Sequence, residues 1–161
     1  MKALAGISIA AANLKTLDSD KAADLVSVLF EDERPLRGIP GLADWRLCGM
    51  ISRFLQQGHL TGMLGERALV PGLGRIPAQR LFLFGGGPRA GYAQSLPQIV
   101  DAIPQVLKAA GSTSVALALP GPSRVLAPEA SRLVQNMSGH IKVVYDADGR
   151  LREWLDRDDD S

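Results

Sequence analysis

The sequence predicts an α/β fold in which a mixed central sheet is sandwiched by helices. Short apolar runs alternate with longer stretches of helical periodicity, which is the pattern of a layered α/β domain. Segments joined by short turns near both ends of the chain favour a mixed sheet over a purely parallel one. The 161 residues fit one domain, and 46% hydrophobic with 22% charged residues is typical of a globular chain. Aromatic residues make up only 5%, so aliphatic side chains must supply the packing.

The first half of the chain contains three predicted strands and one helix. Residues 4–12 are a short apolar run behind a single lysine, which favours a strand over a signal peptide. Residues 24–30, DLVSVLF, are continuously apolar, as expected of a strand buried on both faces. Residues 42–57 carry an apolar stripe at helical spacing. Residues 66–70 read as a strand that ends before a proline and a glycine.

The second half continues the alternation of strands and helices. RLFLF at 80–84 is a strand, and a helix is expected over 96–110, where Pro104 should kink or split it. SVALAL at 114–119 is a strand, and a shorter helix is expected across 128–137. The strands 24–30, 66–70, 80–84 and 114–119 are predicted to be the central members of one sheet. Six of their residues are predicted to be buried, namely Val26, Val28, Leu81, Leu83, Val115 and Leu117.

The C-terminal part, residues 141–155, is a hairpin candidate. Asp146-Ala147-Asp148-Gly149 has turn composition, with the glycine suited to a positive φ. The same tetrapeptide lacks the spacing and closing glutamate of an EF-hand, so a plain turn is favoured over a calcium loop. Residues 1–155 are expected to form one domain, followed by an acidic tail at 156–161.

A series of segments in fixed order carries a family resemblance. The series is DLVSVLF, then QGHLTGMLGE, PGLG at 71–74, IPAQRLFLFGGG, LPQIVDAIPQVLKAAG and SVALALP. From Asp24 to Pro120 the chain resembles the N-terminal domain of the leucyl (cytosol) aminopeptidase family. The resemblance implies a macro-domain-like fold. In the family this domain is not the catalytic one, although it contributes to the corners of a hexamer and, in some bacterial members, takes part in DNA binding.

The family's catalytic chemistry lies in a larger C-terminal domain that holds two metal ions. Its metal-binding segment, Asn-Thr-Asp-Ala-Glu-Gly-Arg, does not occur in this sequence. A two-metal site needs several convergent oxygen ligands, and the acidic residues here are scattered in loops and in the tail. No catalytic residue, metal ligand or cofactor is therefore expected, and the chain is not expected to be an aminopeptidase by itself.

The most suggestive local feature is the glycine-rich loop at 85–91. A strand that ends in glycines before a helix can offer backbone N–H groups to a phosphate, and an arginine can add a charged contact. The resemblance implies an ADP-ribose or nucleotide ligand here, as macro domains bind ADP-ribose with loops that follow strands. The pattern matches neither GxGxxG nor a Walker loop, and Pro88 removes a donor, so a structural turn is favoured. The candidate ligand-binding residues are Gly85, Gly86, Gly87, Arg89 and Gly91.

Cysteine and histidine are too few for a multi-cysteine zinc site or a histidine-rich metal site. Cys48 is the only cysteine, which excludes an intramolecular disulfide, and a buried inert thiol on the predicted helix is expected. His59 and His140 are expected in a loop and a turn, and neither has a second ligand at helical spacing.

Charge is unevenly distributed along the chain. The net charge is +1 and the pI about 7.9, so no global field favours nucleic acid or membrane. Residues 34–89 nevertheless hold eight arginines against Asp44 and Glu66, which gives +6. Interface or solvent roles are favoured over nucleic-acid binding, because the aromatic residues typical of single-strand binders are not interleaved with the arginines.

The leading hypothesis is a stand-alone, non-catalytic binding, assembly or regulatory domain whose partner is another protein or a second copy of itself. The alternatives are a macro-like domain that binds ADP-ribose or a related nucleotide, a DNA-binding module, and the non-catalytic part of a split metallo-aminopeptidase. No apolar run reaches the length of a membrane helix, so no membrane partner is expected and the cytoplasm is the expected compartment.

Overall fold

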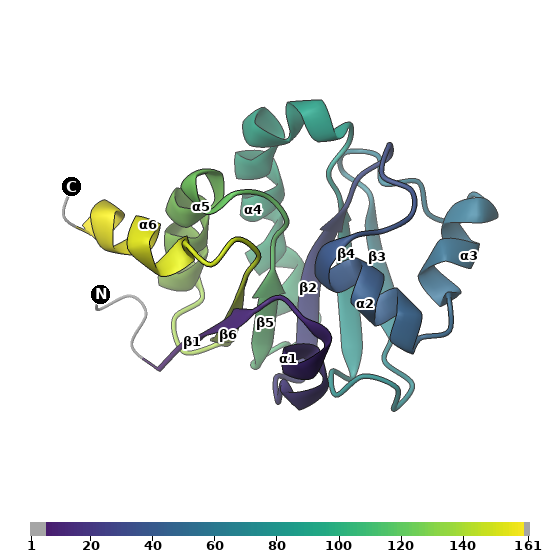
Figure 1. The fold of residues 1–161 in the computed structure, drawn as a ribbon, viewed down its shortest axis with the longest axis horizontal. Helices are drawn as coiled ribbons and strands as arrows, with labels where there is room; N and C mark the ends of the chain where they lie inside the picture. The colour runs from purple at the N-terminus through teal and green to yellow at the C-terminus, as the bar shows by residue number, and fades with distance from the viewer. Residues whose placement is uncertain (1–5, 160–161) are drawn as a thin grey trace.

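A six-stranded mixed sheet forms the centre of the computed structural model, which describes residues 6–159 (Figure 1). The strand order is β1-β6-β5-β2-β4-β3, and all neighbours are parallel except β3 and β4. This confirms the predicted mixed sheet. The strands are β1 Ser8–Ala11, β2 Asp24–Leu29, β3 Arg67–Pro71, β4 Arg80–Gly85, β5 Val115–Ala118 and β6 Ile141–Asp146.

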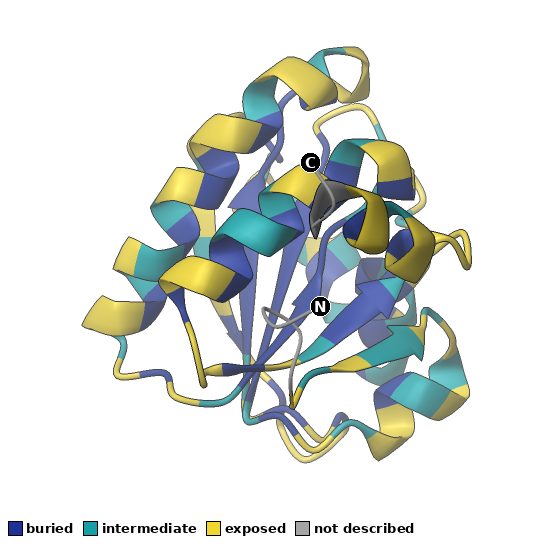
Figure 2. Cartoon of the chain, turned by 90° about the vertical axis from the view of Figure 1, so that its left-hand side faces the viewer, coloured by how far each residue is buried: buried dark blue, intermediate teal, exposed yellow. Residues whose placement is uncertain are grey.

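Helices cover both faces of the sheet, and each face has its own apolar core. Side chains alternate between the faces along a strand, so Val26 joins one core and Leu25 the other. The first core includes α4, α5 and α6, and the second includes α1, α2 and α3. Figure 2 shows the buried strands between helices whose outer surfaces are exposed. The helices are α1 Leu14–Ser19, α2 Gly38–Arg46, α3 Met50–Gln56, the 3-10 turn η2 Arg89–Gly91, α4 Tyr92–Ala109, α5 Ser123–Asn136 and α6 Leu151–Asp159.

The strand prediction is confirmed for the interior of the sheet and wrong for its edge. The six residues predicted to be buried are each at most 2% exposed. The strand near 66–70 is not central, because β3 pairs only with β4 and ends the sheet. Its alternating pattern of exposed and covered residues is typical of an edge strand rather than a strand buried on both faces. No helix among residues 6–159 is long and apolar enough to cross a membrane.

The single helix predicted over 42–57 is instead two helices, α2 and α3. Cys48 and Gly49 both adopt positive φ angles, which ends the first helix and turns the chain. The Asp44 carboxylate then accepts hydrogen bonds from the N–H groups of Ile51 and Ser52, at 2.8 and 3.1 Å, and so satisfies the first turn of α3. Pro104 does not split its helix, because α4 remains helical through both of its prolines, and a kink there stays a prediction.

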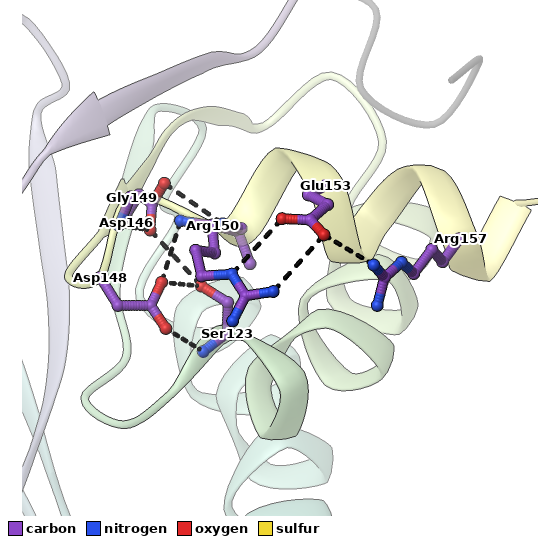
Figure 3. Close-up of polar contacts among 8 residues, drawn as sticks. Ser123, Asp146, Asp148, Gly149, Arg150, Glu153 and Arg157 are labelled. Carbon is purple, nitrogen blue, oxygen red and sulfur yellow. Dashed lines mark hydrogen bonds and ion pairs between the residues drawn. The ribbon is translucent and has the colours of Figure 1, made fainter.

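The predicted C-terminal hairpin is wrong beyond its turn. The chain does turn at Asp146–Gly149, but an α-helix follows β6 in place of a second strand. The Asp146 carboxylate accepts hydrogen bonds from the N–H groups of Gly149 and Leu151. The Asp148 carboxylate accepts one from the N–H group of Arg150 (Figure 3). These carboxylates supply acceptors to the start of α6, which favours a helix at this point.

Helical spacing within α6 accounts for its position on the domain. Leu151 and Leu155, four residues apart, are 1% and 2% exposed, and Glu153 pairs with Arg157 four residues later (Figure 3). Residues 156–159 of the expected acidic tail continue this helix. Residues 160–161 lie outside the described residues.

Candidate functional site

A cleft of about 200 Å³ lies at the carboxyl ends of the parallel strands. From β2 the chain runs past β4 to the edge strand β3, and from β5 it runs in the opposite direction to β6, so the loops after β2 and β5 diverge. Such a switch point is where open α/β sheets bind ligands. The cleft is lined by Ala12, Glu33, Arg37, Gly38, Ile39, Pro40, Arg89, Ala118, Leu119, Pro120, Gly121, Tyr145 and Ala147.

One wall of the cleft comes from the turn after β5 and from the end of β6. Gly121 has a φ of +115°, and a Cβ there would lie 3.1 Å from the Tyr92 ring, so only glycine fits without strain. The Tyr145 hydroxyl donates to Asp20 at 2.7 Å. Burial, together with the bond and negative charge of Asp20, raises the pKa of Tyr145. This phenol therefore stays protonated and serves as a neutral part of the wall.

The opposite wall is the N-terminus of α2. Arg37 precedes the helix in an extended conformation and makes no side-chain cap. Within residues 6–159, the N–H groups of Gly38 and Ile39 donate to no other group. Gly41 lets the preceding loop approach closely, because a Cβ there would lie 2.6 Å from the Leu36 carbonyl oxygen. Free N–H groups and the helix dipole make such a terminus attractive to anions.

Two arginines and one glutamate supply the charge of the cleft. Arg37 is exposed and, in the described part of the chain, has no ion-pair partner. Arg89 pairs with Glu33 from the loop after β2, and its guanidinium carbon lies 4.8 Å from the centre of the Phe30 ring. The cleft therefore has one paired and one unpaired guanidinium beside an uncapped helix terminus.

The three glycines predicted to cradle a phosphate are packed against the domain's own backbone. The N–H groups of Gly85, Gly86 and Gly87 donate to three carbonyl oxygens at 2.7 to 2.8 Å, those of Glu66, Leu29 and Gly62 respectively. A Cβ on Gly85 would lie 1.8 Å from the Met63 carbonyl oxygen, and one on Gly86 would lie 2.7 Å from Val28. These glycines therefore permit close packing, and their N–H groups are already used.

Of the five candidate ligand-binding residues, Arg89 alone lines the cleft. Gly91 precedes α4, and its N–H donates to the Pro88 carbonyl at 3.1 Å. Sequence reasoning missed the rest of the lining, including Arg37, Gly38 and Tyr145. The available signals were the Pro/Gly-punctuated loop after DLVSVLF and the PGP after SVALAL. Both follow strands, but only the strand order shows that they face each other.

The cysteine and histidines do not assemble a second site. The thiol of Cys48 is exposed rather than buried as expected, and the Arg75 guanidinium donates to its sulfur at 2.9 Å. His59 and His140 are both exposed. Among residues 6–159, no group of three or more histidine, cysteine, aspartate or glutamate side chains is arranged to hold a metal ion.

The arginine-rich segment mostly holds the chain's own loops and helices. Six of its eight arginines contact other groups of the domain, and they do so from different elements. Arg80, for example, pairs with Asp24 at the amino ends of the strands, whereas Arg46 pairs with Asp18 of α1. The excess positive charge of the segment is therefore divided among several places.

Sequence comparison finds relatives for part of the chain. No family model matches it. A probable cytosol aminopeptidase of Pseudomonas syringae pv. syringae (strain B728a) is 35% identical over 100 residues, which is 62% of this chain and 20% of that protein. The probable cytosol aminopeptidase of Pseudomonas syringae pv. tomato (strain ATCC BAA-871 / DC3000) is 33% identical over 100 residues, again 62% of this chain and 20% of that protein. The chain thus spans about one fifth of the length of the curated relatives that it matches.

Structure comparison extends the likeness to almost the whole chain. The macro domain of ganglioside induced differentiation associated protein 2 has a TM-score of 0.67 at 16% identity, covering 98% of this chain and 84% of that one. The Oceanobacillus iheyensis macrodomain with ADP gives 0.65 at 12%, covering 89% and 88%. A tomato leucine aminopeptidase variant gives 0.60 at 15%, covering 93% and 35%. The chain is a macrodomain-like α/β domain similar to the N-terminal region of cytosol aminopeptidase.

Proposed function

We propose that this domain is a non-catalytic binding module whose cleft holds a phosphate-bearing nucleotide of the ADP class. The observation that carries the proposal is the uncapped N-terminus of α2, which opens into the cleft beside the unpaired Arg37. Both features favour a negatively charged group at that point. The Oceanobacillus iheyensis macrodomain, which shares the fold, has been solved with ADP.

The chemistry of the walls suits the two halves of such a ligand. The phosphates would accept hydrogen bonds from the N–H groups of Gly38 and Ile39 and face the Arg37 guanidinium. Leu119 and Pro120 offer apolar surface to the base or sugar. The cleft volume of about 200 Å³ is below the roughly 300 to 1,000 Å³ usual for ligand pockets, so part of the nucleotide would extend into solvent.

The absence of catalysis is part of the proposal, and it rests on the groups that face the cleft. Glu33 is engaged by Arg89, and the Tyr145 hydroxyl already donates to Asp20. A general base needs a free carboxylate or imidazole within hydrogen-bond reach of the proton that it removes. While Glu33 is held by Arg89, the described residues that line the cleft offer neither.

Calorimetric titration with ADP tests the proposal. The comparison is between the unmodified domain, Arg37→Ala and Arg67→Ala. Both variants remove an exposed arginine, but Arg67 lies on the edge strand β3, away from the cleft. We expect Arg37→Ala to weaken ADP binding about tenfold, and Arg67→Ala to change it less than about twofold. Equal losses in the two variants, or no ADP binding by any of the proteins, would contradict the proposal.

A second candidate function, assembly with another protein or a second copy, has its own observation. The segment around the edge strand β3 exposes four large apolar side chains, each at least 40% accessible. They are Met63, Leu64, Leu69 and Leu73. An edge strand also has unpaired backbone groups that another chain can use. Analytical ultracentrifugation of the unmodified domain and Leu69→Lys tests this candidate, which predicts an associated species that the substitution disperses.

A further inference from the structure

Arg89 and Glu33 reach the cleft from different loops. Arg89 belongs to the turn between β4 and α4, and Glu33 to the loop after β2. The two side chains form an ion pair within the cleft lining. Side-chain exposure is 51% for Arg89 and only 15% for Glu33. The protein's own carboxylate thus occupies one of the two guanidiniums that an anionic ligand would use.

The surrounding contacts direct Glu33 at Arg89. The Arg34 guanidinium donates to the carbonyl oxygens of Phe30 and Glu33, at 2.8 and 2.7 Å, which folds the loop after β2 back on itself. The Arg89 N–H donates to the Asp32 carboxylate at 3.0 Å, and the Arg89 guanidinium lies over the buried Phe30 ring. These contacts hold the loop in one conformation, and in that conformation the Glu33 side chain lies against Arg89.

We propose that Glu33 is an internal competitor for Arg89, because an anionic ligand must displace its carboxylate before it can bind the Arg89 guanidinium. The inference rests on the proposed function of the cleft. A ligand carboxylate would only replace one carboxylate by another at Arg89 and would gain little. A phosphate carries more charge and offers more acceptors to the planar guanidinium, so it displaces Glu33 with a net gain. Glu33 therefore lowers the affinity of the cleft for every anion that must displace it, and a phosphate overcomes this cost more readily than a carboxylate does.

A simpler role for the same pair is a clamp that joins two loops. If Glu33 serves only to hold the β4–α4 turn in place, its removal loosens Arg89 and weakens every anionic ligand. If Glu33 is a competitor, its removal frees Arg89 and strengthens binding. The two roles therefore predict effects of opposite sign on affinity.

The experiment compares Glu33→Gln with Glu31→Gln. Both variants remove one negative charge from the same loop, but Glu31 is exposed and does not line the cleft. We expect Glu33→Gln to tighten ADP binding about three- to tenfold by calorimetry, as suits the loss of a half-exposed ion pair. We expect Glu31→Gln to change the affinity less than about twofold, as suits a screened surface charge. Unchanged or weaker ADP binding by Glu33→Gln overturns the inference.

A matched pair of ligands separates competition at Arg89 from a general effect of the substitution. Adenosine monophosphate and adenosine share base and sugar, but only the first carries an anionic group. We expect Glu33→Gln to tighten binding of adenosine monophosphate about three- to tenfold and to change that of adenosine less than about twofold, because only the phosphate competes with Glu33 for Arg89. Equal tightening of both ligands, or of neither, overturns the inference.

The outcomes separate this inference from the proposed function. If the unmodified domain binds ADP, Arg37→Ala weakens it and Glu33→Gln does not tighten it, the nucleotide function stands and the role of Glu33 is wrong. If neither the unmodified domain nor Glu33→Gln binds ADP, the nucleotide function itself is wrong. The NMR signal of the Arg89 side chain provides a check without ligand, since it must change in Glu33→Gln and not in Glu31→Gln if the pair exists in solution.

Discussion

The two ends of the parallel sheet treat their charged groups in opposite ways. At the amino ends of the strands, the buried Asp24 carboxylate accepts two hydrogen bonds from Arg80, at 2.7 and 2.8 Å, and one from Ser112. Arg80 also donates to the Ala110 carbonyl at the end of α4. At the carboxyl ends Arg89 pairs with Glu33, but the Arg37 guanidinium and the N–H groups of Gly38 and Ile39 have no partner within residues 6–159. One end is closed by the protein itself, and the other is left open.

This difference shows that a charged or glycine-rich segment does not by itself indicate a site, because its polar groups can be bonded within the fold. The glycine turn at the end of β4 lies at the open end of the sheet, yet its N–H groups donate to carbonyl oxygens of β2 and of the loop before β3. Arg80 carries the same positive charge as Arg37, yet it serves the stability of the domain. We call a position closed where its polar groups are bonded or packed within the domain, and open where they are free. The expected effects of substitutions at both kinds of position run from the largest to the smallest.

Gly85→Ala is expected to have the largest effect on stability, about 3 kcal/mol of destabilisation. The new methyl group would lie 1.8 Å from the backbone oxygen of Met63, so the loop before β3 must move away from the end of β4. Gly91→Ala is the matched control, because no atom lies within 4 Å of its Cβ position. Urea denaturation should show less than about 1 kcal/mol for that variant. Similar losses in the two variants would mean that the glycine turn is not close-packed.

Asp24→Asn should destabilise the domain by about 2 kcal/mol at neutral pH, since it removes the charge that Arg80 and Ser112 satisfy. Burial by itself would raise the pKa of Asp24, but the hydrogen bonds from Arg80 and Ser112, with the Arg80 charge, lower it overall. The contribution is therefore complete above the unfolded value of about 3.9 and is lost as the pH falls through the lowered pKa. Stability curves of the unmodified and Asp24→Asn domains should converge in acid, and parallel curves would contradict this.

Asp148→Ala should cost about 1 kcal/mol, which is typical of a lost helix cap. The Asp148 carboxylate accepts hydrogen bonds from the N–H and hydroxyl groups of Ser123 at the start of α5. It also accepts one from the N–H group of Arg150 before α6 (Figure 3). Thermal denaturation measures the loss. Arg157→Ala is the control, since its ion pair with Glu153 is exposed and worth little. A loss no larger than that of the control would show that α5 does not depend on this cap.

Arg37→Ala should change the free energy of unfolding by less than about 0.5 kcal/mol, although it is expected to weaken ADP binding. Arg37 is exposed and has no ion-pair partner in the described residues, so folding gains little from its side chain. The same denaturation measurement checks this. A loss as large as that of Asp24→Asn would place Arg37 among the closed positions and contradict the contrast between the two ends of the sheet.

Local features of the sequence were sufficient for the interior of the sheet but not for several of its boundaries. The runs at 24–30, 80–84 and 114–119 are continuously apolar, and such runs are stable only when both faces are covered. The break between α2 and α3 depends on an Asp44 carboxylate that reaches seven residues along the chain. The helix after β6 depends on carboxylates in a turn that also suits a hairpin. In each case the local sequence suits two structures about equally well, and side-chain hydrogen bonds decide which of them forms.

The sequence by itself determined the α/β fold and the place of Arg89 after a buried strand, because apolar periodicity and turn residues act over a few neighbouring positions. Only the tertiary structure decided where the cleft lies. Its lining comes from loops near residues 33–40, 118–121 and 145–147, which strand order brings together. Tertiary contacts likewise decided that Gly85, Gly86 and Gly87 are closed, since the carbonyl oxygens that bind their N–H groups belong to other segments. Whether a polar group is free for a ligand depends on those distant partners, and no local pattern records them.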